Sequence, residues 1–245
     1  MVLVYSGFCT FFSAESGFRE KQLEQPRVRG AYQAHLSTVH GLLREKQIPT
    51  NQLYIFIRIL KQEKQLEVWA KGREQAKYRL LRQYPFCAVS GTLGPKRVQG
   101  DGQIPEGVYF INRFHPTSNY HLSLGLNYPN AADRARAATH NPGGDIFING
   151  GCVTIGCVPI TNTGIEELYV LAVEARNSGQ VQIPVHIFPV GLTAANLNWL
   201  SGQYQNRPGL LAFWQNLQPV YTSFEQEKTL PKIGISAAGY TLEQP

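Results

Sequence analysis

The chain has 245 residues, a net charge of +6 and a hydrophobic fraction of 43%. This composition is typical of a folded globular protein and excludes disorder over most of the length. No apolar run approaches the roughly 20 residues that cross a bilayer, so we expect no transmembrane span. The densest basic group, residues 71–82, is typical of a solvated strand face. Attraction to an anionic polymer is the alternative, but no nucleic-acid motif accompanies it, so we expect no nucleic-acid partner.

The first 48 residues divide into three parts. Residues 2–14 are apolar and end in small residues, which predicts an export signal over residues 1–15, although the positively charged start is missing. A buried N-terminal strand is the alternative. Residues 16–48 are predicted to be a polar linker followed by a helix over 31–47, because Tyr32, Leu36, Val39 and Leu43 share one helical face.

Strand patterns dominate from residue 49 to 190 and predict one α+β, mainly β, domain. A helix is expected to begin at a capping box made by Thr163 and Glu166 and to end near residue 177. Residues 130–140 are predicted to form a lid-like loop or short helix, and the long loop 90–107 to be functional. The expected strands are 53–60, 66–70, 78–81, 108–111, 119–126, 146–148 and 185–188.

Residues 191–245 shift to helical periodicity and are predicted to form an accessory region. Two helices are expected, at 192–204 and 210–224. They carry Trp199, Phe213 and Trp214, which we expect to be core residues. The alternative, in which these aromatic side chains form a sugar-stacking platform, would make the chain a carbohydrate-binding or partner-binding module.

The stretch 143–157, Gly-Gly-Asp-Ile-Phe-Ile-Asn-Gly-Gly-Cys-Val-Thr-Ile-Gly-Cys, carries the candidate chemistry. A glycine directly before Cys157 lets backbone N–H groups approach whatever the sulfur attacks, because no Cβ intervenes. A thiol beside backbone donors is what acyl transfer needs, with Gly156 and Cys157 supplying the donors. The alternative is a β-hairpin whose glycines serve only tight turns.

The other cysteines give no metal site, because Cys152 and Cys157 have no second pair and no neighbouring histidines. We therefore expect no metal and no organic cofactor. Cys87 is predicted to be a buried small hydrophobe and Cys152 a core residue. A redox pair between Cys152 and Cys157 is the alternative, and it would block the nucleophile.

The residues Thr154-Ile155-Gly156-Cys157 resemble the [Ser/Thr]-x-Gly-Cys signature of the L,D-transpeptidase catalytic domain (YkuD) family. The resemblance is more specific to the family's YafK-like branch, because three motifs that precede these residues occur in the same order as in that branch. They lie at 90–96, 100–109 and 120–130. The resemblance covers about residues 50–190. It implies a β-sandwich or barrel-like catalytic domain with flanking helices, acting as a monomer in the periplasm or cell envelope. Cys157 would attack a peptidoglycan stem peptide, form a thioester and pass the acyl group to an amine or water.

One departure falls on the chemistry. The branch has a histidine, its general base, where this chain has Asn149, and an amide cannot exchange a proton near neutral pH. Three hypotheses stay open: an impaired enzyme, an enzyme in which His140 is the base, and an inactive protein that binds peptidoglycan or a partner. The residues expected to contact substrate are Thr154, Gly150, His140 and Tyr120.

Overall fold

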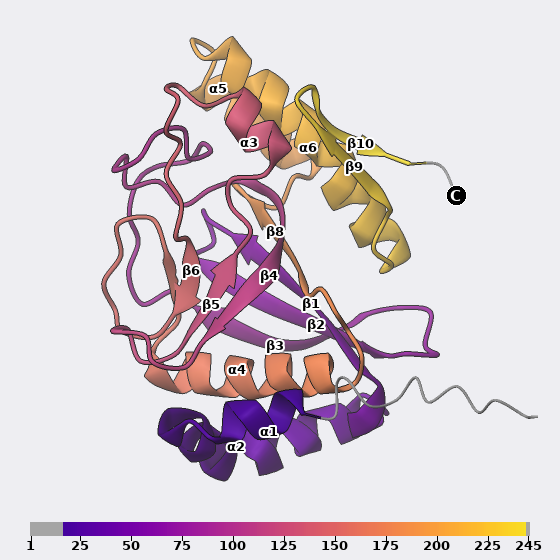
Figure 1. The fold of residues 1–245 in the computed structure, drawn as a ribbon. Coiled ribbons are helices and arrows are strands. Elements are labelled where there is room, and N and C mark those ends of the chain that lie inside the picture. Colours follow the sequence, from indigo (N-terminus) through magenta and orange to yellow (C-terminus); the bar gives the residue numbers. More distant parts are fainter. Residues whose placement is uncertain (1–16, 244–245) are drawn as a thin grey trace, which may run out of the picture.

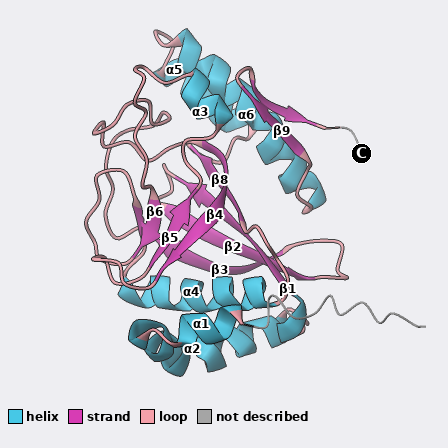
Figure 2. Ribbon diagram, in the orientation of Figure 1, coloured by secondary structure: helices cyan, strands magenta, loops and turns pink. Residues whose placement is uncertain are grey.

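The computed structural model describes residues 17–243. The predicted export signal and Cys9 lie outside the described residues. An eight-stranded mixed sheet occupies the centre, in the order β3-β2-β1-β8-β4-β5-β6-β7 (Figures 1 and 2). The pairs β1–β8 and β6–β7 are parallel and the other pairs are antiparallel. The predicted α+β, mainly β, class is confirmed.

The strands of this sheet are β1 (Leu53–Leu60), β2 (Gln65–Gly72), β3 (Arg79–Pro85), β4 (Gly107–His115), β5 (Ser123–Leu126), β6 (Phe147–Asn149), β7 (Val158–Pro159) and β8 (Pro184–Phe188). A single 3-10 turn, η1 (Thr50–Gln52), leads into β1. The strand expected at 119–126 begins only at Ser123, and the strand expected to end at Ile111 continues to His115.

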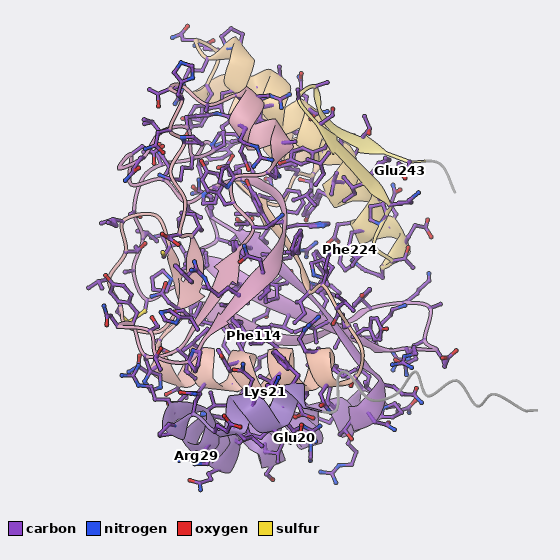
Figure 3. All side chains as sticks on the ribbon, viewed as in Figure 1. Glu20, Lys21, Arg29, Phe114, Phe224 and Glu243 are labelled. Atoms are coloured by element: carbon purple, nitrogen blue, oxygen red, sulfur yellow. A yellow bond between two sulfur atoms is a disulfide. The ribbon has the colours of Figure 1, made fainter. Side chains whose placement is uncertain are left out.

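Three helices cover one face of the sheet: α4 (Asn162–Asn177), α1 (Phe18–Leu23) and α2 (Pro26–Glu45). Helix α4 packs directly on the sheet, and α1 and α2 pack on α4. The ring of Phe114 in β4 meets that of Tyr169 in α4 at 5.4 Å between centroids (Figure 3). The main hydrophobic core therefore lies between the sheet and α4.

The expectation of a linker before residue 30 is wrong, because these residues form α1 and the first turn of α2. Pro26 occupies the first turn of α2, where its missing N–H and fixed φ are favourable. Val28 is fully buried, and Arg19 of α1 pairs with Glu174 of α4 at 2.6 Å. A six-residue helix is not stable by itself, so these tertiary contacts, which local polarity does not reveal, hold it.

The cap predicted for α4 is also wrong by two residues. The N-cap is Thr161, whose Oγ1 accepts a hydrogen bond from Gly164 N at 3.1 Å. Glu166 does not reach back to cap the helix. Its carboxylate instead contacts His35 of α2 and His121 of the β4–β5 loop.

The opposite face carries the C-terminal region, built from α5 (Ala194–Gln203), α6 (Pro208–Glu227) and a hairpin of β9 (Ile233–Ser236) and β10 (Gly239–Leu242), with α3 (Ala131–Ala135) beside them. Phe213 and Trp214 are buried, as predicted for core residues, but Trp199 is 42% exposed. The hairpin has no counterpart in the sequence analysis. Phe224 of α6 packs edge-on against Phe56 of β1 (Figure 3), so α6 closes a second core. No helix in the range 17–243 has both the length and the apolarity to span a bilayer.

A buried ion pair ties the sheet to α6 and to the loop 90–107. Lys61 Nζ lies 2.9 Å from Glu106 Oε1 and donates to the carbonyl oxygens of Gly94 and Ile104. Glu106 is fully buried and also accepts from Gly94 N and Trp214 Nε1, each at 2.7 Å. Every charged atom of the pair therefore has partners, which is the condition under which a buried charge is tolerated.

Replacing Glu106 by alanine leaves the Lys61 ammonium buried without its counter-charge. We expect the free energy of unfolding to fall by about 3–5 kcal/mol, measured by chemical denaturation. The matched control is Glu243→Ala, which removes an exposed ion pair with Lys232 and should cost less than about 1 kcal/mol. Equal losses in the two variants would contradict a special role for the buried pair.

Candidate active site

The register of three strands builds the floor of the site. His115 pairs with Ser123, and Ser123 pairs with Asn149, so these three residues form one rung across β4, β5 and β6. Residues directly opposite one another share a face of the sheet. The neighbouring residues Leu124 and Ile148 are fully buried in the core with α4. The rung therefore projects from the other face.

A second rung lies beside the first, formed by Arg113, Gly125 and Phe147. The Arg113 guanidinium stacks 4.8 Å from the centroid of the Phe147 ring, across Gly125. A Cβ at Gly125 would lie 3.2 Å from both Arg113 Cβ and Phe147 Cε1, so glycine makes room for this stack. Arg113 also pairs with the exposed Asp145 at 2.7 Å.

Cys157 is carried by a tight turn that leads into β7. Thr154 Oγ1 accepts from Gly156 N at 3.1 Å and donates to Cys157 O at 2.7 Å, which closes the turn. Gly156 has φ of +135°, a conformation that side chains disfavour, and a Cβ there would meet Gln103 O at 3.0 Å. The glycine is thus required both by the turn and by the close approach of the loop 90–107.

A cavity of about 530 Å³ lies above the two rungs and contains Cys157. It brings together Asn149, Thr154 and Tyr120 from the predicted site. His140 lines a different cavity, with Arg134 and Pro142, and does not share the one containing Cys157. Gly150 lies at the end of β6, where its N–H donates to Leu122 O, and Gly156 is buried behind the turn.

The wall formed by the β4–β5 loop is held from the N-terminal helices. Arg27 of α2 donates to the carbonyl oxygens of Ser118 and His121 at 2.5 and 2.7 Å. Glu166 joins His121 to His35 of α2, as described above. The helices that the sequence analysis treated partly as a linker therefore position the loop that carries Tyr120.

The loop 90–107 is ordered around Asp101. Its carboxylate accepts from Lys96 Nζ at 2.7 Å and from the backbone N–H groups of Arg97, Val98 and Gln103. Burial opposes the charged form, but these hydrogen bonds outweigh it and hold the pKa of Asp101 below its ordinary value. The carboxylate thus fixes the segment that backs Gly156.

Burial raises the pKa of the Cys157 thiol. A backbone hydrogen bond at Phe147 and the charge of Lys96 act in the opposite direction but do not cancel this effect, and Asp145 adds to it. The thiol donates to Asp145 O at 3.8 Å. The resting site therefore holds a neutral thiol and not a thiolate–imidazolium pair.

Asn149 is buried at the cavity floor. Its Nδ2 donates to Gly150 O, which fixes the orientation of the amide, and its Oδ1 has no partner among the described residues. A buried acceptor without a donor is costly, so the Asn149 amide is an unsatisfied polar group at the cavity floor.

The expectations for Cys87 and Cys152 are wrong, because these two cysteines form a disulfide. Neither residue is buried: Cys87 is half-buried after β3 and Cys152 is exposed in the turn. The bond ties the start of the glycine-rich turn to the end of β3. Among the described residues Cys157 is the free cysteine. Sequence spacing cannot show this pairing, since the two cysteines are separated by 65 residues.

The sequence analysis missed three ionisable residues of the cavity: Arg113, His115 and Asp145. The signal for two of them was available, because Arg113 and His115 lie at a spacing of two beyond the predicted strand end. Within residues 17–243 no group of three or more His, Cys, Asp or Glu side chains is arranged to hold a metal ion.

A sequence model of the L,D-transpeptidase catalytic domain (YkuD) family matches residues 53–187, which is more than half of the chain. The chain belongs to this family. The match begins at β1 and ends in β8, so it contains both rungs and the Cys157 turn.

Among curated proteins, the chain is similar to the Escherichia coli K12 protein named "Putative L,D-transpeptidase YafK". The two are 37% identical over 193 residues, which cover 78% of this chain and 74% of that protein. Among solved structures, it overlaps the helical cell shape determining protein Pgp2 from Campylobacter jejuni at 18% identity with a TM-score of 0.45, covering 76% of this chain and 74% of that one. L,D-transpeptidase 1 of Mycobacterium tuberculosis overlaps at 12% identity with a TM-score of 0.32, covering 56% and 62% of the two chains.

A neutral resting thiol predicts a distinctive labelling profile. The rate at which iodoacetamide alkylates Cys157 should rise about tenfold per pH unit through and beyond the ordinary cysteine pKa of about 8.5, because only the thiolate reacts and burial raises the pKa. Peptide mapping by mass spectrometry separates Cys157 from Cys9. A labelling rate that is already maximal near pH 6 would show that a resting ion pair exists.

The disulfide should stabilise the fold and the turn that carries Cys152. Replacing both Cys87 and Cys152 by serine should lower the free energy of unfolding by about 2–4 kcal/mol, since closing a long loop restricts the unfolded chain. Wild type treated with a reductant should show the same loss, and the double variant should not respond to the reductant. A wild type whose stability does not change on reduction would contradict this.

Proposed function

We propose that the chain is a cysteine acyltransferase of the cell wall, an L,D-transpeptidase or related hydrolase that acts on peptidoglycan stem peptides through a thioester on Cys157. One observation carries this proposal: the free thiol of Cys157 stands on a glycine-backed turn inside a cavity, in a chain of the L,D-transpeptidase family. The thiol attacks the peptide carbonyl next to a D-stereocentre, releases a D-amino acid and passes the acyl group to an amine or to water.

Backbone geometry supplies one candidate donor for the oxyanion. The Gly156 N–H donates to Thr154 Oγ1 and is therefore occupied by the turn. The Cys157 N–H donates to no acceptor within residues 17–243. It lies on the residue that carries the nucleophile, where a single fixed donor contributes about 10²–10³ to the rate of acyl transfer. Thr154 holds the turn that carries this donor.

The lining of the cavity fits a peptide that is partly aliphatic and partly charged. Its volume of about 530 Å³ lies in the range of small-ligand sites. Val153 and Ile155 are 60% and 86% exposed on the rim, an unusual position for aliphatic side chains that a bound chain would cover. Arg113 and Asp145 present opposite charges at the same cavity, and a stem peptide carries both carboxylates and ammonium groups.

The disulfide supports the location proposed for this activity. Disulfides persist in oxidising compartments and are rare where thiols are kept reduced. Together with the export signal expected at residues 1–15, this favours the periplasm or cell envelope, where peptidoglycan lies. We propose residues 49–190 as the catalytic domain and residues 191–245 as its accessory region, in a protein that acts as a monomer.

A second candidate function is binding of stem peptides without turnover. Two observations favour it: Asn149 stands in the position of the family's histidine, and burial raises the pKa of the nucleophile. Such a protein would keep affinity for the cell wall and release no product.

The two candidates are separated by Cys157→Ala. On purified stem peptides followed by chromatography, wild type should release the terminal D-amino acid, and the variant should release none while keeping peptide affinity, because the thioester cannot form. His40→Ala is the control, since it changes an exposed residue of α2 outside the cavity of Cys157. Binding without release in wild type would establish the second candidate.

A further inference from the structure

Asn149, in the position of the family's histidine, cannot take the proton of the neutral Cys157 thiol. His186 is buried beside Phe56, and burial and the charge of Arg58 lower its pKa to about 3. The remaining histidines are divided among several surfaces of the molecule. His35 and His121 contact Glu166, His40 lies with Arg44 at the end of α2, and His140 lines a separate cavity.

His115 differs from these five because it lines the cavity of Cys157. His115 shares a rung with Ser123 and Asn149, so its side chain projects from the same face of the sheet as Asn149, the position of the family's histidine. Two strand spacings of about 4.8 Å separate the backbones of His115 and Asn149, so the imidazole stands on the opposite side of the cavity floor. Its ring lies 6.2 Å from the ring of Phe147, between centroids, and is half-buried.

Asn149 supplies the second observation. Its buried Oδ1 has no partner, while its Nδ2 is held by Gly150 O. In the sheet order, β6 with Asn149 lies between β4, which carries His115, and β7, which Cys157 precedes, so the amide forms the cavity floor between these two residues and water in the cavity must connect them. General acid–base catalysis works through one intervening water as well as by direct contact.

We propose that His115 is the proton-transferring catalytic residue of this site, acting through water in the cavity that it shares with Cys157. This inference rests on the proposed function. The inference places the imidazole on β4, the first strand of the rung, and not on β6, the third strand, where the family's histidine would lie. The chemistry of the imidazole is the same in both positions.

The two half-reactions balance with these groups. In the first, the Cys157 S–H proton passes through water in the cavity to the His115 imidazole, and the thiolate forms a C–S bond with the peptide carbonyl. The C–N bond then breaks, and the leaving amine takes the proton from the imidazolium. In the second, the acceptor amine or water gives its proton to His115 and attacks the thioester carbonyl. The C–S bond breaks, and the thiolate takes the proton back.

The first test compares His115→Ala with His40→Ala, the same substitution at an exposed histidine of α2. On stem peptides, we expect His115→Ala to reduce kcat by about 10²–10⁴-fold and His40→Ala to leave it unchanged. The residual rate of His115→Ala should rise with the thiolate population up to high pH, whereas the wild-type rate should reach its plateau at a lower pH, because the imidazole takes the thiol proton during the reaction. Circular dichroism checks that both variants fold.

A rescue variant distinguishes chemistry from packing. Adding Asn149→His to His115→Ala places an imidazole on the same rung and in the same cavity, and it should recover at least tenfold of the lost rate. A loss that appears in His140→Ala and not in His115→Ala would overturn the proposal. So would a His115→Ala loss that is equal at every pH and is not recovered by Asn149→His, because that result indicates a structural role.

A second measurement separates this inference from the proposed function. The ester p-nitrophenyl acetate acetylates Cys157 without a stem peptide, and mass spectrometry follows hydrolysis of the acetyl thioester. We expect hydrolysis to be about 10²-fold slower in His115→Ala than in wild type or His40→Ala. If stem peptides are not turned over but this difference appears, the proposed function fails and the role of His115 stands. If Cys157-dependent peptide turnover is found and neither assay responds to His115→Ala, the role of His115 is wrong and the function stands.

Discussion

The pairing of β5 between β4 and β6 determines both the core and the site. Side chains alternate along a strand, so one set of residues packs on α4 while the next set faces the cavity. A slip of one residue in β6 would exchange Ile148, which is fully buried in the core, with Asn149 on the cavity floor. The cost of exposing Ile148 and burying a polar amide against α4 fixes the register. The chemistry of the cavity is thus set by the same hydrophobic burial that holds the sheet together.

The position of the nucleophile depends on a second constraint, the approach of two backbones at Gly156. The turn that carries Cys157 rests against Gln103 O, and Gln103 N is in turn held by Asp101. The end of the same loop is fixed by the buried Glu106. A disturbance of α6 can therefore reach the cavity through Trp214, Glu106 and the loop, although α6 does not line it. This chain of contacts couples the C-terminal region to the cavity that contains Cys157.

The fold class, most strands along the chain and the Cys157 turn could be predicted from the sequence, because period-two patterns and glycine–cysteine spacing are local signals. The order of the strands in the sheet could not, because it depends on pairing between distant segments. The helices at residues 18–45 could be predicted only in part, since the polar segment before residue 30 owes its structure to contacts such as Arg19–Glu174. The disulfide could not be predicted because its two cysteines are far apart in the sequence. The cap of α4 was misplaced because two nearby threonines, Thr161 and Thr163, could each begin the helix. His115 was missed because the strand was predicted to end at Ile111, four residues too early.

The disulfide and the buried, neutral thiol are the two features that determine how Cys157 can react. Pairing of Cys152 with Cys87 removes the residue that could otherwise block Cys157, so an oxidising compartment and a free nucleophile are compatible in this chain. Burial keeps that nucleophile protonated at neutral pH, which also protects it, since the thiolate is the form that oxidises most readily. A resting ion pair with a histidine at position 149 would give a more reactive thiol but also a more oxidisable one. With the imidazole of His115 across the cavity, as we propose, the thiol can stay neutral until a substrate is bound.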